Sequence, residues 1–298
     1  MPTVVPTVVE VVQALVDGVM LGATYSLLGL GFTLIFGVLR RLNLAFGPAI
    51  LVGVWAGSHL HLAWGGAPAL FPAVAGATVG GAVLAGAYVE RCSFRPLLRQ
   101  APVVAMVSSF AVAMQLQELV ALGSPSRTMP YPAPAWLPAL ALGPLLLRSD
   151  ALLMWAGASA LLIGLFVLLY RTRTGAAIRA VSESPEGATL MGIDAGAVSA
   201  LAFVLASATG GVAGVLIAAS HRQVTSYFGF WATVKGLTVM LLGGAGSLPG
   251  AALGGLALGV VEVLALTYLG GQSRDLVAYA LLFAVVALTP RPRWGDPR

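Results

Sequence analysis

Long uncharged stretches, separated by short arginine-rich segments, make up most of this chain. The segment from Val8 to Leu39 is apolar apart from two acidic residues, and the segment from Leu42 to Val89 contains no Asp, Glu, Lys or Arg. A helix that crosses a bilayer needs about 20 predominantly apolar residues. The second segment is therefore long enough for two crossings, with a turn at HLAWGGAP. The first could form one long tilted helix, or a surface segment followed by a span.

Membrane segments recur along the rest of the chain. We expect them at Ala101–Leu122, Ala151–Tyr170, Gly196–Ala219 and Leu276–Pro290. Glycines and a proline interrupt another uncharged run at GGAGSLPG, which predicts two pieces, about Phe230 to Leu242 and Gly250 to Tyr268. Broken helices are tolerated in membranes where the irregular backbone is buried in protein or lines water, and the short first piece is expected to be re-entrant. The pattern predicts an all-α, polytopic transmembrane helical bundle of about eight or nine membrane segments, forming a single domain over residues 1–298.

Composition supports the membrane interpretation. The chain is 58% hydrophobic and 9% charged, with a mean hydropathy of +0.93, whereas soluble domains carry about 25% charged residues. The net charge of +5 comes from arginines that hold loops in the cytoplasm, so nucleic acid is not an expected partner. Cys92 is the single cysteine, which excludes an internal disulfide and a cysteine-cluster metal site. No metal site is expected at His59 and His61 either, because residues two apart do not share a helix face.

The distribution of arginines predicts the topology. Membrane proteins keep an excess of Lys and Arg in their cytoplasmic loops. If successive segments cross an inner membrane in alternating directions, the C-terminus lies in the cytoplasm and the proline-rich stretch Gly123–Asp150 lies outside. The side on which the N-terminus lies is left undecided. This topology puts eleven arginines inside, namely Arg40, Arg41, Arg91, Arg95, Arg99, Arg171, Arg173, Arg179, Arg291, Arg293 and Arg298. It puts four outside, namely Arg127, Arg148, Arg222 and Arg274.

The longest polar interruption with helical character runs from Arg171 to Asp194, RTRTGAAIRAVSESPEGATLMGID. Ser184 is a good N-cap, the proline after it suits the first helical position, and Gly192 is a plausible stop. The helix between them, Pro185 to Met191, has about two turns. An isolated helix this short is unstable in water. It is either a solvated loop or a segment that docks against another surface.

Ionisable residues within the predicted membrane segments are functional candidates, because each costs at least about 2.5–3.5 kcal/mol to bury unpaired. They are Asp17, Glu118, Lys235 and Glu262. For Lys235 we favour snorkelling of the ammonium group to the external interface over a role in a translocation pathway. For Glu262 a hydrogen bond between helices and a pathway role are equally supported. Asn43 could line a path or cap the helix that follows it.

Glycines four residues apart predict close helix crossings, because small residues on one face let two backbones approach. Such pairs are Gly18/Gly22, Gly76/Gly80, Gly210/Gly214, Gly250/Gly254 and Gly255/Gly259. The segment from Gly250 to Gly259 is the strongest packing candidate, because two pairs fall within it.

Enzymatic motifs are absent from the sequence. The only lysine lies in VKGLT, without the glycines and the Ser or Thr of a P-loop. No HExxH or GxSxG motif occurs. The chain is therefore expected to be neither an ATPase nor a hydrolase of these types, and to bind no cofactor.

Four motifs, in this order, resemble the permease subunits of branched-chain amino acid ABC importers of the LivH type. They are GATYSLLGLGFTLIFGVLRRLNLAFG from Gly22, ERCSFRPLLR from Glu90, TGAAIRAVSESPEGATLMGI from Thr174, and LLGGAGSLPGAALGGLALGVVEVL from Leu241. The resemblance implies a transporter permease domain with three kinds of partner: separate ABC ATP-binding subunits, a second homologous permease chain in a homodimer or heterodimer, and an extracytoplasmic solute-binding protein.

The resemblance also implies a role for the polar segment described above. Residues 179–192 correspond to the family's cytoplasmic coupling loop, whose short helix would dock into a groove of the ATP-binding subunit. Glu186, Thr189 and Leu190 lie three and four apart and share one face. The full set of docking candidates is Arg179, Glu183, Ser184, Pro185, Glu186, Thr189, Leu190 and Gly192.

One departure from the family pattern leaves the cargo open. Relatives commonly have Asn-Phe-Ala-His-Gly-Glu where this chain has Asn43-Leu44-Ala45-Phe46-Gly47-Pro48. Cargo could be a branched-chain amino acid or a related small polar solute such as an amide or urea, and Asn43, Phe46, Lys235 and Glu262 are pathway candidates. The alternatives are a sugar-type ABC permease and a secondary transporter that uses Glu262 or Asp17 to bind an ion. No charged ring or filter motif supports a channel.

Overall fold

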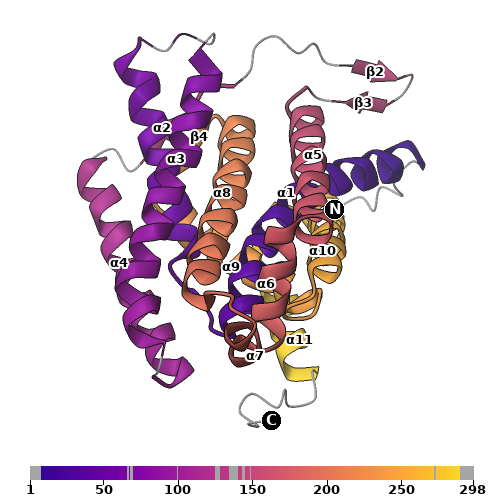
Figure 1. The fold of residues 1–298 in the computed structure, drawn as a ribbon. Coiled ribbons are helices and arrows are strands. Elements are labelled where there is room, and N and C mark those ends of the chain that lie inside the picture. The colour runs from indigo at the N-terminus through magenta and orange to yellow at the C-terminus, as the bar shows by residue number, and fades with distance from the viewer. Residues whose placement is uncertain are drawn as a thin grey trace.

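The computed structural model describes residues 8–65, 67, 70–98, 100–124, 128–133, 140–142, 145–147, 149–271 and 273–288. Arg99, Arg127, Arg148, Arg291, Arg293 and Arg298 lie outside these ranges. The helices are α1 (Val8–Leu39), α2 (Phe46–Ala63), α3 (Phe71–Val89), α4 (Pro102–Gly123), α5 (Ser149–Arg171), α6 (Arg173–Glu183), α7 (Pro185–Leu190), α8 (Ala195–His221), α9 (Phe228–Leu242), α10 (Leu248–Leu269) and α11 (Ser273–Leu288) (Figure 1). A π-helical segment (Glu90–Phe94) and a 3-10 segment (Arg95–Leu97) follow α3.

The all-α membrane architecture is confirmed. Within the described ranges, seven helices are long and apolar enough to cross a membrane, namely α1, α2, α3, α4, α5, α8 and α10, and α9 and α11 are shorter apolar helices. The segment from Val8 to Leu39 is one continuous helix, which settles the choice between one helix and two pieces.

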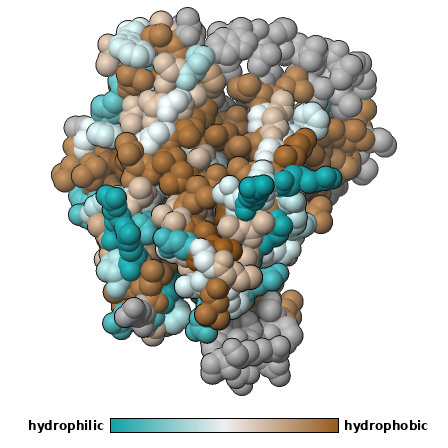
Figure 2. Space-filling view, viewed as in Figure 1, coloured by the Kyte–Doolittle hydropathy of each residue, from teal (hydrophilic) through white to brown (hydrophobic). Residues whose placement is uncertain are grey.

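Helix α1 forms the centre of the bundle. It packs against α10, α8, α9 and α5, and 89% of its most apolar window is buried inside the protein, against 28% for α4 and 22% for α5. The outer helices therefore turn apolar side chains outward. Figure 2 shows such side chains across the upper and middle part of one face, with more hydrophilic ones in the lower half. This distribution suits a bundle surrounded by lipid.

Glycines allow α1 and α10 to approach closely. A Cβ atom added at Gly255 would overlap the backbone of Ser26, and one at Gly259 would overlap the backbone of Gly22. Gly250 and Gly254 make similarly close approaches to the last turn of α9 at Gly243. The prediction differs from the structure at Gly76 and Gly80 on α3, where no heavy atom lies within 4 Å of an added Cβ. The spacing of glycines in the sequence does not show whether the helix face that carries them packs against another helix.

The break between α9 and α10 lies where the sequence predicts it. Helix α9 ends at Leu242 and α10 begins at Leu248, with the side chain of Ser247 accepting a hydrogen bond of 3.2 Å from the backbone of Gly250. Gly244 and Gly246 have φ angles of 86° and 91°, a left-handed backbone that strongly favours glycine. Two helices of opposite direction can therefore meet within five residues.

Two short antiparallel ribbons were not predicted. Strand β1 (Thr128–Pro130) pairs with β4 (Gln223–Thr225), and β2 (Leu140–Leu142) pairs with β3 (Leu145–Leu147). The ribbon of β1 and β4 joins residues far apart in the chain, and β4 follows the end of α8 that lies away from α7 (Figure 1). Three-residue strands with a distant partner leave no periodic signal in the sequence.

Tyr131 anchors this ribbon to the helices. Its backbone amide donates to Arg222 O at 2.9 Å, and its hydroxyl shares a hydrogen bond of 2.7 Å with Thr78 on α3. Ser58 on α2 also donates to Pro130 O at 2.8 Å. Burial raises the pKa of the Tyr131 phenol to about 12, an effect that the Thr78 hydrogen bond partly offsets. The ribbon is thus tied to α2 and α3 by side-chain hydrogen bonds and to the end of α8 by a backbone hydrogen bond.

At the other end of the bundle, Arg41 fixes the loop between α3 and α4. Its guanidinium donates to Leu97 O at 3.0 Å, Leu98 O at 2.8 Å and Gln100 O at 2.7 Å. Burial lowers the pKa of this guanidinium from its usual value. Three carbonyl acceptors match the fork of donors that only arginine provides.

Candidate functional site

The polar segment from Arg171 to Asp194 contains two helices rather than one. Sequence reasoning missed α6, which begins after Thr172, whose side chain accepts a hydrogen bond of 3.1 Å from the amide of Gly175. Ile178 and Val181, three positions apart, are its buried residues along with Gly175. This spacing is the amphipathic signal that could have revealed the helix from the sequence.

Helix α7 forms as predicted from its capping residues. Ser184 accepts a hydrogen bond of 3.0 Å from the amide of Gly187, and Pro185 occupies the first helical position. The helix ends at Leu190, one residue earlier than expected, and Gly192 has a left-handed φ of 83°. Asp194 then caps α8, accepting hydrogen bonds of 2.8 Å from Gly196 N and 3.1 Å from Ala197 N. Local capping therefore sets the whole course of the chain here.

Contacts to the bundle hold α6 and α7 in place. Ser182 on α6 donates from its hydroxyl to Gly37 O at 2.8 Å, and the guanidinium of Arg40 donates to Ser182 O at 3.3 Å. Ala188 is the buried residue of α7, 1% exposed. Two polar contacts thus connect the segment directly to the last turn of α1, the central helix.

One face of α7 is left uncovered. Leu190 is 90% exposed and the following Met191 is 71% exposed. Glu183, Ser184, Pro185, Glu186, Thr189 and Gly192 are also exposed. The hydroxyl of Thr189 donates within the helix, to Pro185 O at 2.8 Å. Two large apolar side chains therefore protrude from a short, firmly capped helix.

Arg179 differs from the other docking candidates. Its guanidinium donates to Leu169 O and lies 5.3 Å from the centre of the Tyr170 ring. It therefore ties α6 to the end of α5.

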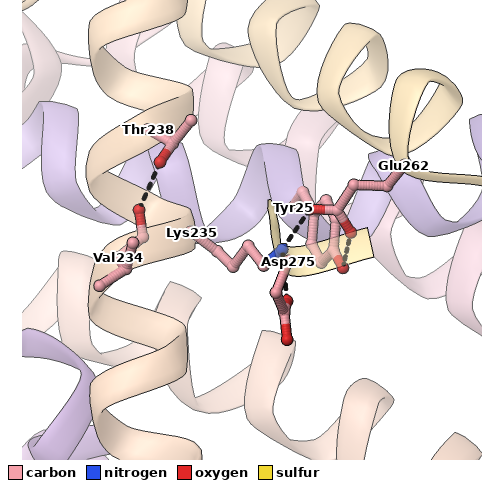
Figure 3. A network of polar contacts seen from close by, with 6 residues as sticks. All are labelled: Tyr25, Val234, Lys235, Thr238, Glu262 and Asp275. Carbon is pink, nitrogen blue, oxygen red and sulfur yellow. Dashed lines mark hydrogen bonds and ion pairs between the residues drawn. The ribbon is translucent and has the colours of Figure 1, made fainter. Parts of the chain in front are cut away.

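A second candidate site lies inside the bundle, around Lys235. The ammonium group of Lys235 donates to Glu262 and lies 3.1 Å from Oδ1 of Asp275, and both Lys235 and Glu262 have no solvent exposure. Figure 3 shows these side chains converging with Tyr25, whose hydroxyl donates to the other oxygen of Glu262 at 2.8 Å. The network joins α1, α9, α10 and α11.

The snorkelling interpretation of Lys235 is therefore wrong. A lysine side chain reaches the interface only when its stem has a path to water, and α9 packs between α1, α2, α10 and α11. Pairing with a carboxylate is the other way to accommodate a buried ammonium. Glu262 does form hydrogen bonds between helices, one of the two roles expected from the sequence, because it accepts from Tyr25 and Lys235.

Aromatic rings complete the surroundings of the ammonium group. Its nitrogen lies 5.8 Å from the ring centre of Tyr25 and 5.7 Å from that of Trp231. Electron-rich ring faces at this distance attract cations. Sequence reasoning did not select Asp275, because it lies at the start of the last apolar segment, where an acidic residue is ordinary. The role of Asp275 becomes visible only when the structure places Lys235 beside it.

A cavity of about 270 Å³ adjoins this network at the β4 end of the bundle. The end of α8, strand β4, the first turns of α9 and the first turn of α11 form its walls. Asp275 lines the cavity and is 52% exposed, while Lys235 behind it is fully buried. Within the described residues, no group of three or more His, Cys, Asp or Glu side chains could hold a metal ion.

Asn43 and Phe46 lie apart from this cavity, near the α6 end of α1. Asn43 is buried and its side-chain oxygen accepts a hydrogen bond of 3.0 Å from Ala45 N, just before α2 begins. Phe46 is buried against Phe32, with ring centres 4.8 Å apart. Of the other ionisable candidates, Asp17 accepts a hydrogen bond of 3.1 Å from Gln13 on the same helix, and Glu118 is exposed on α4. The structure thus brings Lys235 and Glu262 together but places Asn43 and Phe46 elsewhere.

Comparison with known proteins gives matches over nearly the whole chain. Residues 14–286 match the family described as the branched-chain amino acid transport system permease component. The chain is 32% identical over 300 residues to the high-affinity branched-chain amino acid transport system permease protein LivH of Salmonella typhimurium, with 96% of each chain covered. It is 32% identical over 294 residues to LivH of Escherichia coli K12, again covering 96% of each, and 30% identical over 303 residues to BraD of Pseudomonas aeruginosa, covering 98% of each.

Solved structures with a similar fold include PsaBC from Streptococcus pneumoniae in complex with Fab, with a TM-score of 0.51, 14% identity, and 93% of this chain and 91% of that chain covered. A structure described as an inward-facing metal-chelate type ABC transporter has a TM-score of 0.52 and 17% identity, with 93% and 85% covered. At these identities the likeness shows the fold alone.

Proposed function

Since this chain belongs to the family of permease components of branched-chain amino acid transport systems, we propose that it carries a small solute inward across the cell membrane. The cargo is a branched-chain amino acid or a related small polar solute such as an amide or urea. Permeases of this family carry no catalytic activity and belong to multi-subunit ABC systems. ATP hydrolysis therefore takes place on separate ATP-binding subunits, and this chain binds no cofactor of its own.

The observation that carries the proposal is the exposed apolar tip of α7. Leu190 and Met191 are 90% and 71% exposed, although large apolar side chains outside the lipid region are normally covered in a complete assembly. The tip lies at one end of the bundle, away from the outer faces of the long helices (Figure 1). A groove on an ATP-binding subunit would cover these two side chains.

The arginines at the α7 end support a cytoplasmic location for this end. Arg171 ends α5, Arg173 and Arg179 lie on α6, and Arg40 contacts Ser182 of α6. Arg41 binds the segment after α3, which also contains Arg91 and Arg95. Such an excess favours the cytoplasmic side. The C-terminal side of α11 would then also be cytoplasmic, in the inner membrane. The opposite end, with the ribbon of β1 and β4, would face an extracytoplasmic solute-binding protein, and the outer helices would contact a second homologous permease chain.

Movement of α7 would reach the bundle through α6. When two ATP-binding subunits close, they would displace α7, and the contacts of Ser182 with Gly37 and Arg40 would pass this displacement to α1. Because α1 packs against four other helices, its tilt would alter access to the interior from either side. This is a rocking motion of packed helices around a fixed centre.

The test is ATP-driven uptake together with co-purification of an ATP-binding subunit. Leu190→Asp places a charge on the apolar tip, and we expect loss of co-purification and of uptake. Leu62→Asp is the matched control, because Leu62 is 56% exposed in the last turn of α2, the end of that helix that contacts β1, and it should keep the subunit bound. Co-purification that survives Leu190→Asp would contradict docking at α7. Uptake by the chain without any ATPase would instead support a secondary transporter.

A further inference from the structure

Among the described residues that line the cavity, Asp275 is the one with a full negative charge. Among the described side chains of the buried network, one ammonium group faces two carboxylates, and Lys235 already has Glu262 as a fully buried partner. Asp275 is the half-exposed member and the one that lines the cavity. A carboxylate in this position attracts a cationic group, since the low dielectric of the surroundings strengthens the attraction.

A second acceptor lies on the same cavity. The ring atom Nδ1 of His221 lies 2.9 Å from Ile217 O. A carbonyl oxygen can only accept, so Nδ1 carries the proton in this contact. In the neutral ring the remaining nitrogen, Nε2, is then an acceptor. Asp275 and His221 thus both suit a ligand group that donates hydrogen bonds.

The rest of the lining is largely apolar and aromatic. Ile217, Val224, Phe228 and Trp231 line the cavity. Such side chains suit the aliphatic part of a ligand, and the faces of the aromatic rings also attract a neighbouring cation. The cavity of about 270 Å³ lies just below the range of about 300–1,000 Å³ that holds drug-sized ligands. Its size therefore points to a small ligand.

We propose that this cavity binds the ammonium end of a small aliphatic amine or amino acid, with Asp275 as the anchoring carboxylate. The cavity lies at the far end of α8 from α7, about 40 Å along the helix at 1.5 Å per residue over 27 residues. It is therefore a cargo site at the end where cargo enters, and in this respect it rests on the proposed function. Lys235 acts as a positioning residue, because it holds Asp275 at the cavity wall.

Three related compounds test the site on the purified full-length chain in lipid nanodiscs. Leucine has both an ammonium and a carboxylate group, isoamylamine keeps the ammonium and the alkyl chain, and isocaproate keeps the carboxylate and the alkyl chain. We expect leucine and isoamylamine to bind and to change the intrinsic tryptophan fluorescence of the protein, because Trp231 lines the cavity, with isocaproate having no effect. Sodium chloride at the same concentration controls for ionic strength. This comparison uses the unchanged protein, so it does not depend on how any variant folds.

Substitution of the anchor gives the second test. Asp275→Asn keeps the size of the side chain and removes its charge, so the dissociation constant for isoamylamine should rise about 10-fold or more. Asp275→Glu should retain most of the binding. Asp17→Asn is the control, because Asp17 lies on α1 outside the cavity lining, and it should leave the constant unchanged.

Two results would overturn the site: isocaproate binding as well as isoamylamine, or amine binding that is unaffected by Asp275→Asn. Neither measurement involves an ATP-binding subunit. Failure of the site would therefore leave docking at α7 standing, and loss of docking would leave amine binding standing.

Discussion

Tyr25 on α1 donates a hydrogen bond of 2.8 Å to Glu262 on α10, across 237 positions of the chain. Both residues are fully buried, and Glu262 also accepts from Lys235. The central helix of the bundle is thus tied to an ion pair that would be costly if either partner were left alone. Helices α1 and α10 are therefore held together both by this hydrogen bond and by the close packing of their glycines.

Removal of the Tyr25 hydroxyl should destabilise the protein. We expect Tyr25→Phe to lower the free energy of unfolding by about 1–3 kcal/mol, because a hydrogen bond to a buried charged group is lost. The melting temperature in detergent measures this. Tyr88→Phe is the matched control, since the hydroxyl of Tyr88 donates to Gln115 at 3.0 Å on the exposed surface. Equal shifts for the two variants would show that burial of the acceptor does not matter.

The ion pair should behave as a unit. Lys235→Met leaves two carboxylates without the ammonium between them, which we expect to cost about 3–5 kcal/mol. Glu262→Gln should cost less, because Lys235 keeps Asp275 as a partner. The double variant should lose less than the sum of the two, because the interaction between Lys235 and Glu262 is lost only once. A double-mutant cycle of melting temperatures and membrane expression measures this coupling. Additive losses would argue that the two side chains are stabilised independently.

The contact between α6 and α1 should affect transport more than assembly. Ser182→Ala removes the hydroxyl that donates to Gly37 O, and we expect uptake to fall roughly threefold or more. Co-purification of the ATP-binding subunit should persist, because α7 keeps its own caps. Thr267→Ala removes a comparable hydroxyl that donates to Val263 O at 2.8 Å on the exposed face of α10, and it should leave uptake unchanged. A parallel loss of binding and uptake would mean that Ser182 serves docking instead.

Glycine substitutions should have opposite effects at two positions. Gly255→Ala forces a methyl group into the backbone of Ser26, so we expect destabilisation of about 1–3 kcal/mol. Gly76→Ala places the same methyl group in open space, where replacing a helical glycine should be neutral or stabilising by up to about 1 kcal/mol. Melting temperatures of the two variants test this directly. A destabilised Gly76→Ala would indicate that a partner chain packs against this face of α3.

Tyr131 should make the protein sensitive to alkaline pH. Its pKa in the folded protein is about 12, above the ordinary value of 10.0, so the neutral phenol is favoured by folding. Stability is therefore fully present below pH 10 and falls as pH rises toward 12, by up to about 3 kcal/mol at 1.36 kcal/mol per unit. Melting temperatures across this range measure the loss, which Tyr131→Phe should reduce. An unchanged alkaline profile would contradict burial of the neutral phenol.

Much of the fold follows from local features of the sequence. Uncharged length predicts the membrane helices, because the bilayer core holds no water and a helix satisfies the hydrogen bonds of its own backbone. Ser184, Pro185 and Gly192 predict the limits of α7 to within one residue, because capping depends on neighbouring residues. The glycines of GGAGSLPG likewise mark the break between α9 and α10, where a left-handed backbone is needed.

Contacts between distant residues required the folded chain. No local pattern indicates that Lys235 meets Asp275 and Glu262, that β1 pairs with β4, or that Gly255 faces another helix while Gly76 does not. Whether a lysine in an apolar segment reaches the interface depends on which helices surround it, and four helices surround α9. Local propensity acts over a few residues, whereas burial and ion pairing depend on which helix faces meet. That is why the sequence pattern predicts the helices of this permease, and only the packing of those helices reveals its buried charges and its cavity.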